Sequence, residues 1–175
     1  MTYKEELTQA MTKLANDKRT LFLGQSVCYS GQAMFPTLEG VPFEKRIEMP
    51  IAEEMQMGIS IGLSIVGFIP ISLYSRMDFL LLAMNQLVNH LDKIVWLSKG
   101  EFMPKVIIRT LVGSKTPLDG GLQHTQDYSE VIKPFIPNIE VFRLTDAECI
   151  IPCYQEAMRS PKSSLMVEYG DKYGD

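Results

Sequence analysis

The sequence predicts an α/β fold: three layers, with a mostly parallel sheet covered by helices on both faces. Short apolar segments of strand length alternate with helical segments about six times along the chain. The strand segments are continuously apolar rather than alternating, which is typical of strands buried on both faces. With 175 residues, the chain is long enough for one domain with a sizeable core.

The first half of the chain is expected to hold a helix at 3–18, a strand at 20–27, a strand at 46–49, a helix at 51–66 and a strand at 69–75. The first helix has Leu7, Met11 and Leu14 on one face. Each strand is a short apolar run ended by polar or turn-forming residues. Residues 28–44 are rich in Gly and Pro and are expected to form a loop.

The second half is expected to hold a helix at 78–97, a strand at 105–113, a short helix at 128–136, a strand at 139–144, a helix at 145–159 and a strand at 163–169. Asp78 is the expected N-cap of the first of these helices. Thr145 and Glu148 have the spacing of a capping box, and Pro152 predicts a kink or restart in the same helix. Residues 1–169 therefore form the predicted domain, and residues 170–175 a flexible tail.

Composition and charge argue against several classes of partner. The net charge is −4 and the basic residues are scattered singly, so neither nucleic acid nor an anionic membrane surface is expected to bind. The apolar stretch from Gly58 to Leu73 is too short to span a membrane, and the N-terminal segment lacks the apolar core of a signal peptide. The three cysteines lack metal-ligand spacing, so we expect no metal site and a cytoplasmic location.

Two of the predicted loops carry reactive groups. In a parallel sheet, ligands bind beyond the carboxyl ends of the strands. Glu53 and Glu54 fall in the first turn of a helix after Pro50, where carboxylates favour the helix dipole. His124 follows a Gly-Gly pair that lets the backbone approach a ligand. These patterns alone favour structural roles, and neither a nucleophile elbow nor a Gly-rich phosphate loop is present in the sequence.

One long segment carries a family resemblance. Residues 46–109, which include "PIAEEMQMGISIGLSIVG" and "DFLLLAMNQLVN", resemble the pyrimidine-binding domain of thiamine-diphosphate enzymes. The resemblance continues in order through "GGLQHTQ", "PNIEVFRLTDAE", "AMRSP" and "LMVEY", and so reaches from the first helix to about Tyr169. Transketolase and deoxyxylulose-phosphate synthase share this domain. The segments "AMNQLVNHLDKI" and "LSKGEF" are more similar to the beta subunit of pyruvate and branched-chain 2-oxoacid dehydrogenases.

The resemblance implies roles for three side chains. Glu53 matches the acid of the family's P-I-x-E motif, which donates a proton to nitrogen N1′ of the cofactor's aminopyrimidine ring. This favours the imino tautomer that removes the C2 proton of the thiazolium ring. Phe79 matches the aromatic residue that stacks on the aminopyrimidine. His124 matches the histidine that faces the substrate or lipoyl group and assists acyl transfer, whereas Glu54 keeps its structural role.

The sequence departs from the family in its first loop and in its length. Gln25 stands where the family usually has an acid, and it can carry neither a proton nor a negative charge. The family's C-terminal domain is not seen here, nor is the G-D-G motif with its Asn that marks the domain holding Mg²⁺ and the diphosphate. The resemblance thus implies an alpha-type partner subunit that holds both, in a homodimer or an α2β2 assembly.

We therefore expect the beta-type subunit of a two-subunit thiamine-diphosphate-dependent enzyme. Such an enzyme decarboxylates a small-molecule 2-oxoacid and passes on the acyl or aldehyde unit. One alternative is half of a transketolase-type carboligase, which shares Glu53 but transfers groups between carbonyl compounds. The other alternative is a non-catalytic regulatory subunit with the same fold. The sequence does not name the 2-oxoacid, because the family's substrate pocket is built partly from the partner chain.

Overall fold

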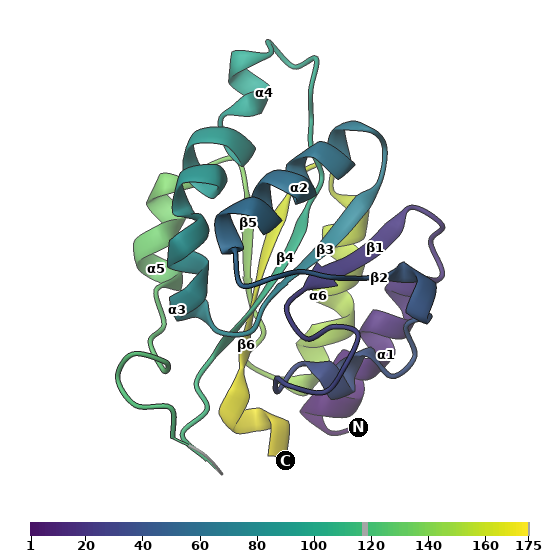
Figure 1. The fold of residues 1–175 in the computed structure, drawn as a ribbon, viewed down its shortest axis with the longest axis vertical. Helices are drawn as coiled ribbons and strands as arrows, with labels where there is room; N and C mark the ends of the chain where they lie inside the picture. Colours follow the sequence, from purple (N-terminus) through teal and green to yellow (C-terminus); the bar gives the residue numbers. More distant parts are fainter. Residues whose placement is uncertain (117–118, 175) are drawn as a thin grey trace.

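A computed structural model describes residues 1–116 and 119–174 of the chain. Its centre is a six-stranded sheet with the order β2-β1-β3-β4-β6-β5 (Figure 1). Every neighbouring pair of strands is parallel, which confirms the predicted fold class. The strands are Thr20–Gly24 (β1), Arg46–Glu48 (β2), Ile69–Tyr74 (β3), Ile107–Val112 (β4), Glu140–Arg143 (β5) and Ser164–Tyr169 (β6).

Helices cover both faces of this sheet and complete the three layers (Figure 1). One face carries α1 (Tyr3–Ala15) and α6 (Ala147–Arg159), whose apolar sides bury residues such as Leu7 and Ile150. The other face carries α2 (Glu53–Ile65), α3 (Met77–Leu80), α4 (Ile94–Leu97) and α5 (Ser129–Ile132). The apolar stripe of each main helix lies on an apolar sheet face, and this burial is the dominant favourable term in folding.

Helix α2 is held on β3 by buried polar side chains. Gln56 Nε2 donates hydrogen bonds to Leu73 O at 2.9 Å and to Ser72 Oγ at 3.0 Å. Ser60 Oγ, one turn further along, donates to Ser72 Oγ at 3.1 Å. Buried polar groups are costly unless paired, so these bonds fix the position of α2 along the strand. Glu53 is thereby held near the carboxyl end of β3.

The helix expected at 78–97 is irregular. After α3 the chain passes through a 3₁₀ turn at Leu81–Ala83 and a π-helical segment at Gln86–Leu91, and it ends in α4. Arg76, not Asp78, is the N-cap, because the extended backbone ends at Arg76 with φ −147° and ψ 149°. The π-helical segment leads to Asp92, a fully buried carboxylate that accepts a hydrogen bond from Asn138 N at 2.8 Å. Tertiary anchoring here overrides the regular helix that the pattern predicts.

Helix α6 is a single helix through Pro152, whose side chain is exposed, so of the two expectations at this position the restart is wrong. Its N-cap is Asp146, and no side-chain cap is formed. Thr145 Oγ1 donates to Asp146 Oδ2 at 2.8 Å, so Thr145 and Glu148 do not form the expected capping box.

The segment expected to be a flexible tail continues the fold. Gly170–Gly174 form a 3₁₀ helix, whereas Asp175 lies outside the described residues. The Tyr173 hydroxyl donates to the Glu168 carboxylate, and the Tyr173 ring lies 5.9 Å from that of Tyr3. An aromatic side chain that buries its ring and satisfies its hydroxyl holds this segment against the sheet.

A buried ion pair links β4 to β6. Arg109 and Glu168 have no solvent-exposed surface, and Arg109 Nε and one terminal nitrogen donate to the two Glu168 oxygens at 2.7 and 3.0 Å. The Tyr154 hydroxyl of α6 donates to the same carboxylate at 2.7 Å. Sheet and helix layer are therefore joined through one carboxylate.

Replacing Glu168 by Gln is expected to lower the free energy of unfolding by about 3–5 kcal/mol, because the Arg109 guanidinium is left buried without its counter-charge. Urea denaturation of the two proteins measures the difference. The control is Glu156→Gln, which breaks the exposed 3.6 Å pair with Arg159. That variant is expected to lose less than about 1 kcal/mol. Equal losses in the two variants would contradict the role assigned to the buried pair.

Gly24 ends β1 in close contact with β3, where an added Cβ would lie 2.6 Å from Leu73 O. Gly24→Ala is therefore expected to lower stability by about 1–3 kcal/mol through overpacking. Gly62, inside α2, has nothing within 4 Å of the same added atom. Gly62→Ala is expected to raise stability by about 0.5–1 kcal/mol through helix propensity. Thermal denaturation measures both variants, and Gly24→Ala is expected to be less stable than the wild type and Gly62→Ala more stable. A stabilised Gly24→Ala would refute the close contact.

Candidate functional site

The candidate site lies where the chain changes direction across the sheet. β1 pairs with β2 on one side and with β3 on the other, so the connections after these strands diverge and open a crevice at their carboxyl ends. A cavity of about 550 Å³ occupies this position. Residues from three strand ends line it, among them Gln25, Ser75, Arg76, Phe79 and Ser114.

Glu53 and Phe79 meet in a smaller hollow beside this cavity. Glu53 is the half-buried first residue of α2, and Phe79 projects from α3. Gln25 and Tyr74 line the same hollow. Burial raises the pKa of Tyr74, and the nearby charge of Glu53 raises it further. The carboxyl group and the aromatic ring predicted to contact one cofactor ring therefore lie in one place, although their roles stay predictions.

His124 contacts the same aromatic ring. The rings of Phe79 and His124 meet edge to face, with centroids 5.4 Å apart and an interplanar angle of 89°. His124 Nδ1 is buried and has no hydrogen-bond partner in residues 1–116 and 119–174. Phe79 thus packs against His124 and lines the same hollow as Glu53, although the three residues come from separate segments of the chain.

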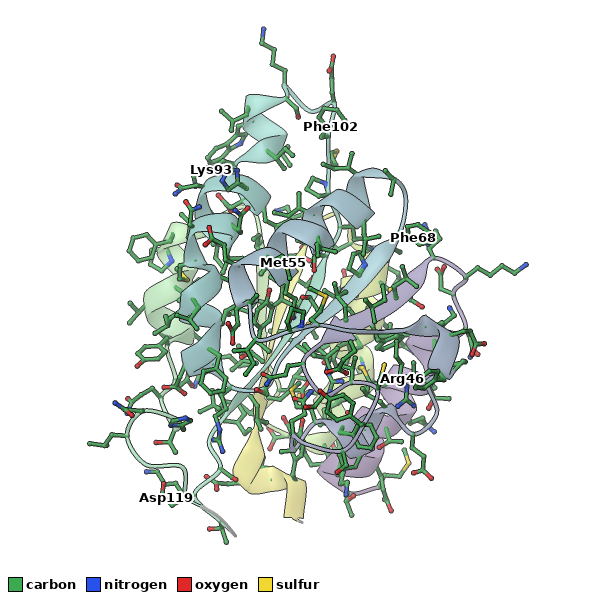
Figure 2. All side chains as sticks on the ribbon, in the orientation of Figure 1. Arg46, Met55, Phe68, Lys93, Phe102 and Asp119 are labelled. Carbon is green, nitrogen blue, oxygen red and sulfur yellow. The ribbon has the colours of Figure 1, made fainter. Side chains whose placement is uncertain are left out.

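Arg76 holds the loop that carries His124. One of its terminal nitrogens donates to the carbonyl oxygens of Gly113 and His124, each at 2.7 Å. Gly120 packs over the guanidinium, since an added Cβ there would lie 3.3 Å from Arg76 Cζ. In Figure 2 this loop, marked by Asp119, extends beyond the end of the sheet. Sequence reasoning missed Arg76, although a single basic residue directly after an apolar strand was a usable signal.

Glu48 shapes the opposite side of the crevice and was also missed. Its carboxylate accepts hydrogen bonds from the backbone N–H groups of Ser26 at 2.5 Å and of Val27 and Cys28 at 2.9 Å. Ser26 has a positive φ of 53°, a strained conformation for a residue with a side chain. The anion therefore stabilises a tight turn directly after Gln25, whose side chain lines both hollows.

Glu54, the second acid of the pair, does not line either hollow of the crevice. It is exposed and accepts a hydrogen bond from Asn85 Nδ2 at 3.2 Å. This contact between α2 and the following helical segment agrees with the structural role expected for Glu54. In the described part of the chain, no group of three or more His, Cys, Asp or Glu side chains is placed to hold a metal ion.

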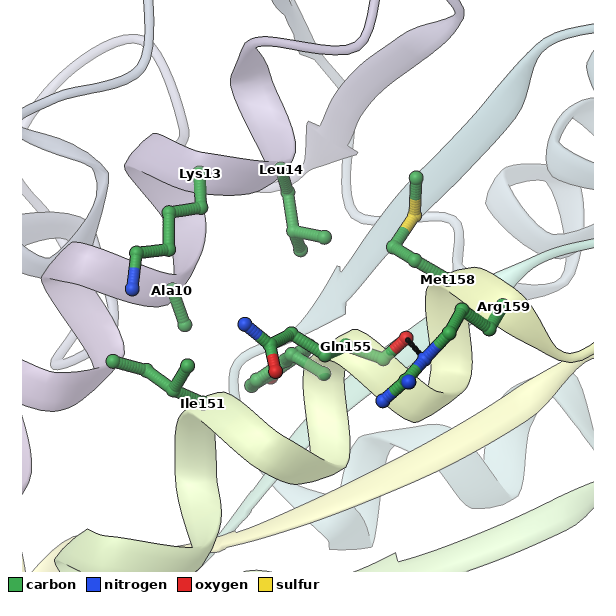
Figure 3. Close-up of a pocket in the computed structure, with 8 residues that line it drawn as sticks. Ala10, Lys13, Leu14, Ile151, Gln155, Met158 and Arg159 are labelled. Atoms are coloured by element: carbon green, nitrogen blue, oxygen red, sulfur yellow. Dashed lines mark hydrogen bonds between the residues drawn. The ribbon is translucent and has the colours of Figure 1, made fainter.

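A second cavity, of about 490 Å³, lies between α1 and α6 on the other face of the sheet (Figure 3). Ala10, Leu14 and Ile151 line it, with Lys13 and Arg159 also contributing. None of the predicted site residues contributes to it. Within the described residues, no helix combines the length and apolar character needed to cross a membrane.

Asp127 anchors the end of the His124 loop. Its carboxylate accepts hydrogen bonds from Ser129 N at 2.9 Å and Ser129 Oγ at 2.6 Å, and it pairs with Arg143 at 3.1 Å. Burial acts to raise the pKa of Asp127, but the Ser129 hydrogen bonds and the Arg143 charge hold it below the ordinary value of 3.8. A carboxyl whose pKa is lower in the folded state stabilises the fold above the unfolded pKa.

Asp127→Asn is therefore expected to cost about 1 kcal/mol of stability at pH 7. The difference in stability between Asp127→Asn and the wild type should shrink as the pH falls below 3.8, the ordinary pKa, and through the lower pKa of Asp127 in the folded state. At such pH the wild type also loses the negative charge of Asp127. Urea unfolding between pH 7 and pH 3 measures this. Glu130→Gln removes the exposed acid 3.5 Å from the same Arg143 and serves as the control with little change. A deficit that does not vary with pH would contradict the charged anchor.

Comparison with curated proteins gives relatives in one group of enzymes, while no protein-family model matches the chain. The pyruvate dehydrogenase E1 component subunit beta of Gracilaria tenuistipitata is 34% identical over 117 residues, covering 65% of this chain and 36% of the relative. The 2-oxoisovalerate dehydrogenase subunit beta of Bacillus subtilis is 27% identical, with 75% and 41% covered. The mitochondrial pyruvate dehydrogenase E1 beta subunit of Saccharomyces cerevisiae is 26% identical over all of this chain and 48% of its own length.

Solved structures give the same fold. A chain described as split gene transketolase, inactive beta4 tetramer, superposes with a TM-score of 0.75 and 20% identity over 97% of this chain and 51% of its own length. The transketolase from Campylobacter jejuni gives a TM-score of 0.75 and 17% identity, covering 97% and 26%. The chain spans less than half the length of the curated relatives described above. It resembles, in sequence, part of the beta subunits of pyruvate and branched-chain 2-oxoacid dehydrogenases, and it has the fold of a transketolase domain.

Proposed function

We propose that this chain is the beta-type subunit of a thiamine-diphosphate-dependent enzyme that decarboxylates a 2-oxoacid and transfers the resulting acyl or aldehyde unit. One observation carries the proposal most directly: Glu53 and Phe79 line one hollow at the carboxyl edge of the sheet. His124 packs against the same Phe79 ring. The sequence similarity to 2-oxoacid dehydrogenase beta subunits supports the choice of substrate class.

The residues of the hollow fit the aminopyrimidine part of thiamine diphosphate. Phe79 offers an aromatic face for stacking, and Glu53 a carboxyl group that donates a proton to a ring nitrogen. When bound, the cofactor supplies the carbanion chemistry. His124, whose Nδ1 is buried without a partner in the described residues, packs against the Phe79 ring. It is the group we assign to proton transfer during acyl transfer.

We assign the diphosphate and Mg²⁺ to an alpha-type partner subunit, in a homodimer or α2β2 assembly. Apolar side chains beside Glu53 support such a partner. Ile51, Met55 and Leu82 expose 75%, 46% and 61% of their surface, and Met55 is labelled on α2 in Figure 2. Contiguous exposed apolar groups around a half-buried acid are typical of a site completed by another chain. The three free cysteines fit a reducing, cytoplasmic location.

Glu53→Gln is expected to lower turnover about 10²- to 10⁴-fold, because glutamine cannot donate and regain the proton. The tagged chain is purified from its source cells with the protein bound to it. That complex is then supplied with thiamine diphosphate, Mg²⁺ and a panel of 2-oxoacids, and the release of carbon dioxide is measured.

Glu54→Gln is the matched control, since it changes the neighbouring, exposed acid and is expected to keep turnover near that of the wild type. Full activity of Glu53→Gln would overturn the proposed role. Transfer between carbonyl compounds without carbon dioxide release would favour the carboligase. A complex that ignores the cofactor would favour the regulatory subunit.

A further inference from the structure

The crevice contains an arginine that forms no ion pair with a carboxylate in residues 1–116 and 119–174. Of the described residues that line the cavity of about 550 Å³, Arg76 alone is charged. No carboxylate of the described residues forms an ion pair with it, in contrast to Arg109, Arg143 and Arg159. A cation placed in a cleft without a counter-charge attracts anionic ligands.

The geometry leaves part of the guanidinium free for such a ligand. The carbonyl oxygens of Gly113 and His124 occupy one terminal nitrogen and fix the plane of the group. The other terminal nitrogen and Nε make no hydrogen bond to residues 1–116 or 119–174. These two N–H groups form the fork that matches two oxygens of a carboxylate or phosphate.

Two acids at the edge of the cleft are engaged by backbone groups. Glu48 is bound by three backbone N–H groups of the turn after β1. Asp171, beside Gly113, accepts hydrogen bonds from Lys115 N at 2.6 Å and Thr116 N at 3.1 Å. Neither forms an ion pair with Arg76. Uncharged hydroxyl and amide groups make up the remaining polar lining. Among them is Gln32 Oε1, a buried acceptor that has no hydrogen-bond partner among the described residues.

We propose that Arg76 binds a second anionic group of the substrate, a carboxylate or phosphate remote from the reacting carbonyl carbon. This inference rests on the proposed function. The carboxylate that leaves as carbon dioxide loses its charge in the reaction, so a guanidinium bound to it would stabilise the ground state more than the transition state. A remote anion keeps its charge throughout, and its binding positions the substrate. The substrate class is thus a 2-oxo compound with an acidic far end.

Equilibrium binding tests the site without turnover. Glutarate and inorganic phosphate are titrated separately into the full chain by calorimetry, and Arg76→Gln is expected to weaken the better probe about 10- to 100-fold. Arg159→Gln, on the far side of the sheet, is expected to bind as the wild type does. Tighter binding of glutarate indicates a carboxylate, and tighter binding of phosphate a phosphoryl group. The inference is overturned if neither probe binds, or if Arg76→Gln binds both as well as the wild type.

Turnover separates this inference from the proposed function. In the complex with the partner, 2-oxoglutarate and a ketose phosphate carry a remote anion, whereas pyruvate does not. Arg76→Gln also removes the two hydrogen bonds that hold the His124 loop, so kcat is expected to fall for every substrate. KM is expected to rise about 10- to 100-fold for the preferred anionic substrate and much less for pyruvate. A purely structural role, through the His124 loop, would change KM for both substrates alike and would overturn the inference while Glu53→Gln still lowers turnover. If Glu53→Gln has no effect, the proposed function fails, and the calorimetric result still decides whether Arg76 binds anions.

Discussion

The parallel pairing of β1 with β3 is the constraint on which the site depends. The pairing runs from Thr20 opposite Ile69 to Gly24 opposite Leu73, so both strands end at the same edge. β2 lies on the side of β1 opposite to β3, so the loop that follows β1 and the loop that follows β3 run in opposite directions across the sheet. The close approach at Gly24 leaves no space for a side chain between the strand ends. The candidate site side chains Glu53, Phe79 and His124 come from the helices and loops that follow the strands.

Charged side chains hold these loops by bonding to backbone groups. Glu48 binds the N–H groups after β1, Arg76 binds the carbonyl oxygens after β4 and near His124, and Asp127 binds the N–H group that opens α5. Backbone groups of a loop at a sheet end have no ladder partner, and a charged partner satisfies them more strongly than a neutral one. Glu48 thus sets the position of the turn after Gln25, Arg76 that of the His124 backbone, and Asp127 that of the end of the His124 loop.

The sequence predicted the layers well, because the spacing of apolar residues within a segment indicates which side of that helix or strand is buried. Every expected strand is present, although the boundaries shift by up to three residues, as for β1. The N-cap at Asp78 and the regular helix at 78–97 were misjudged, because the geometry of that segment depends on contacts distant in sequence, such as the one between Asp92 and Asn138. Glu48 and Arg76 were missed for the same reason: their partners lie 20 to 22 and 37 to 48 positions away. Glu53, Phe79 and His124 were found through the family resemblance, since their residue types alone favoured structural roles.

The two contacts that hold Arg76 also determine what kind of ligand it suits. A free arginine side chain loses several rotatable bonds when it binds, and that entropy subtracts from affinity. Here the loss is already incurred in folding, because Gly113 and His124 fix the guanidinium and Gly120 packs over it. The remaining N–H groups are consequently rigid, and rigid forks discriminate between planar, two-oxygen anions and single charges better than a mobile lysine. Since the same guanidinium fixes the His124 backbone, an anion bound to Arg76 and a group facing His124 are held on one rigid unit, which is the arrangement that orients a substrate with a reacting carbonyl at one end and an anion at the other.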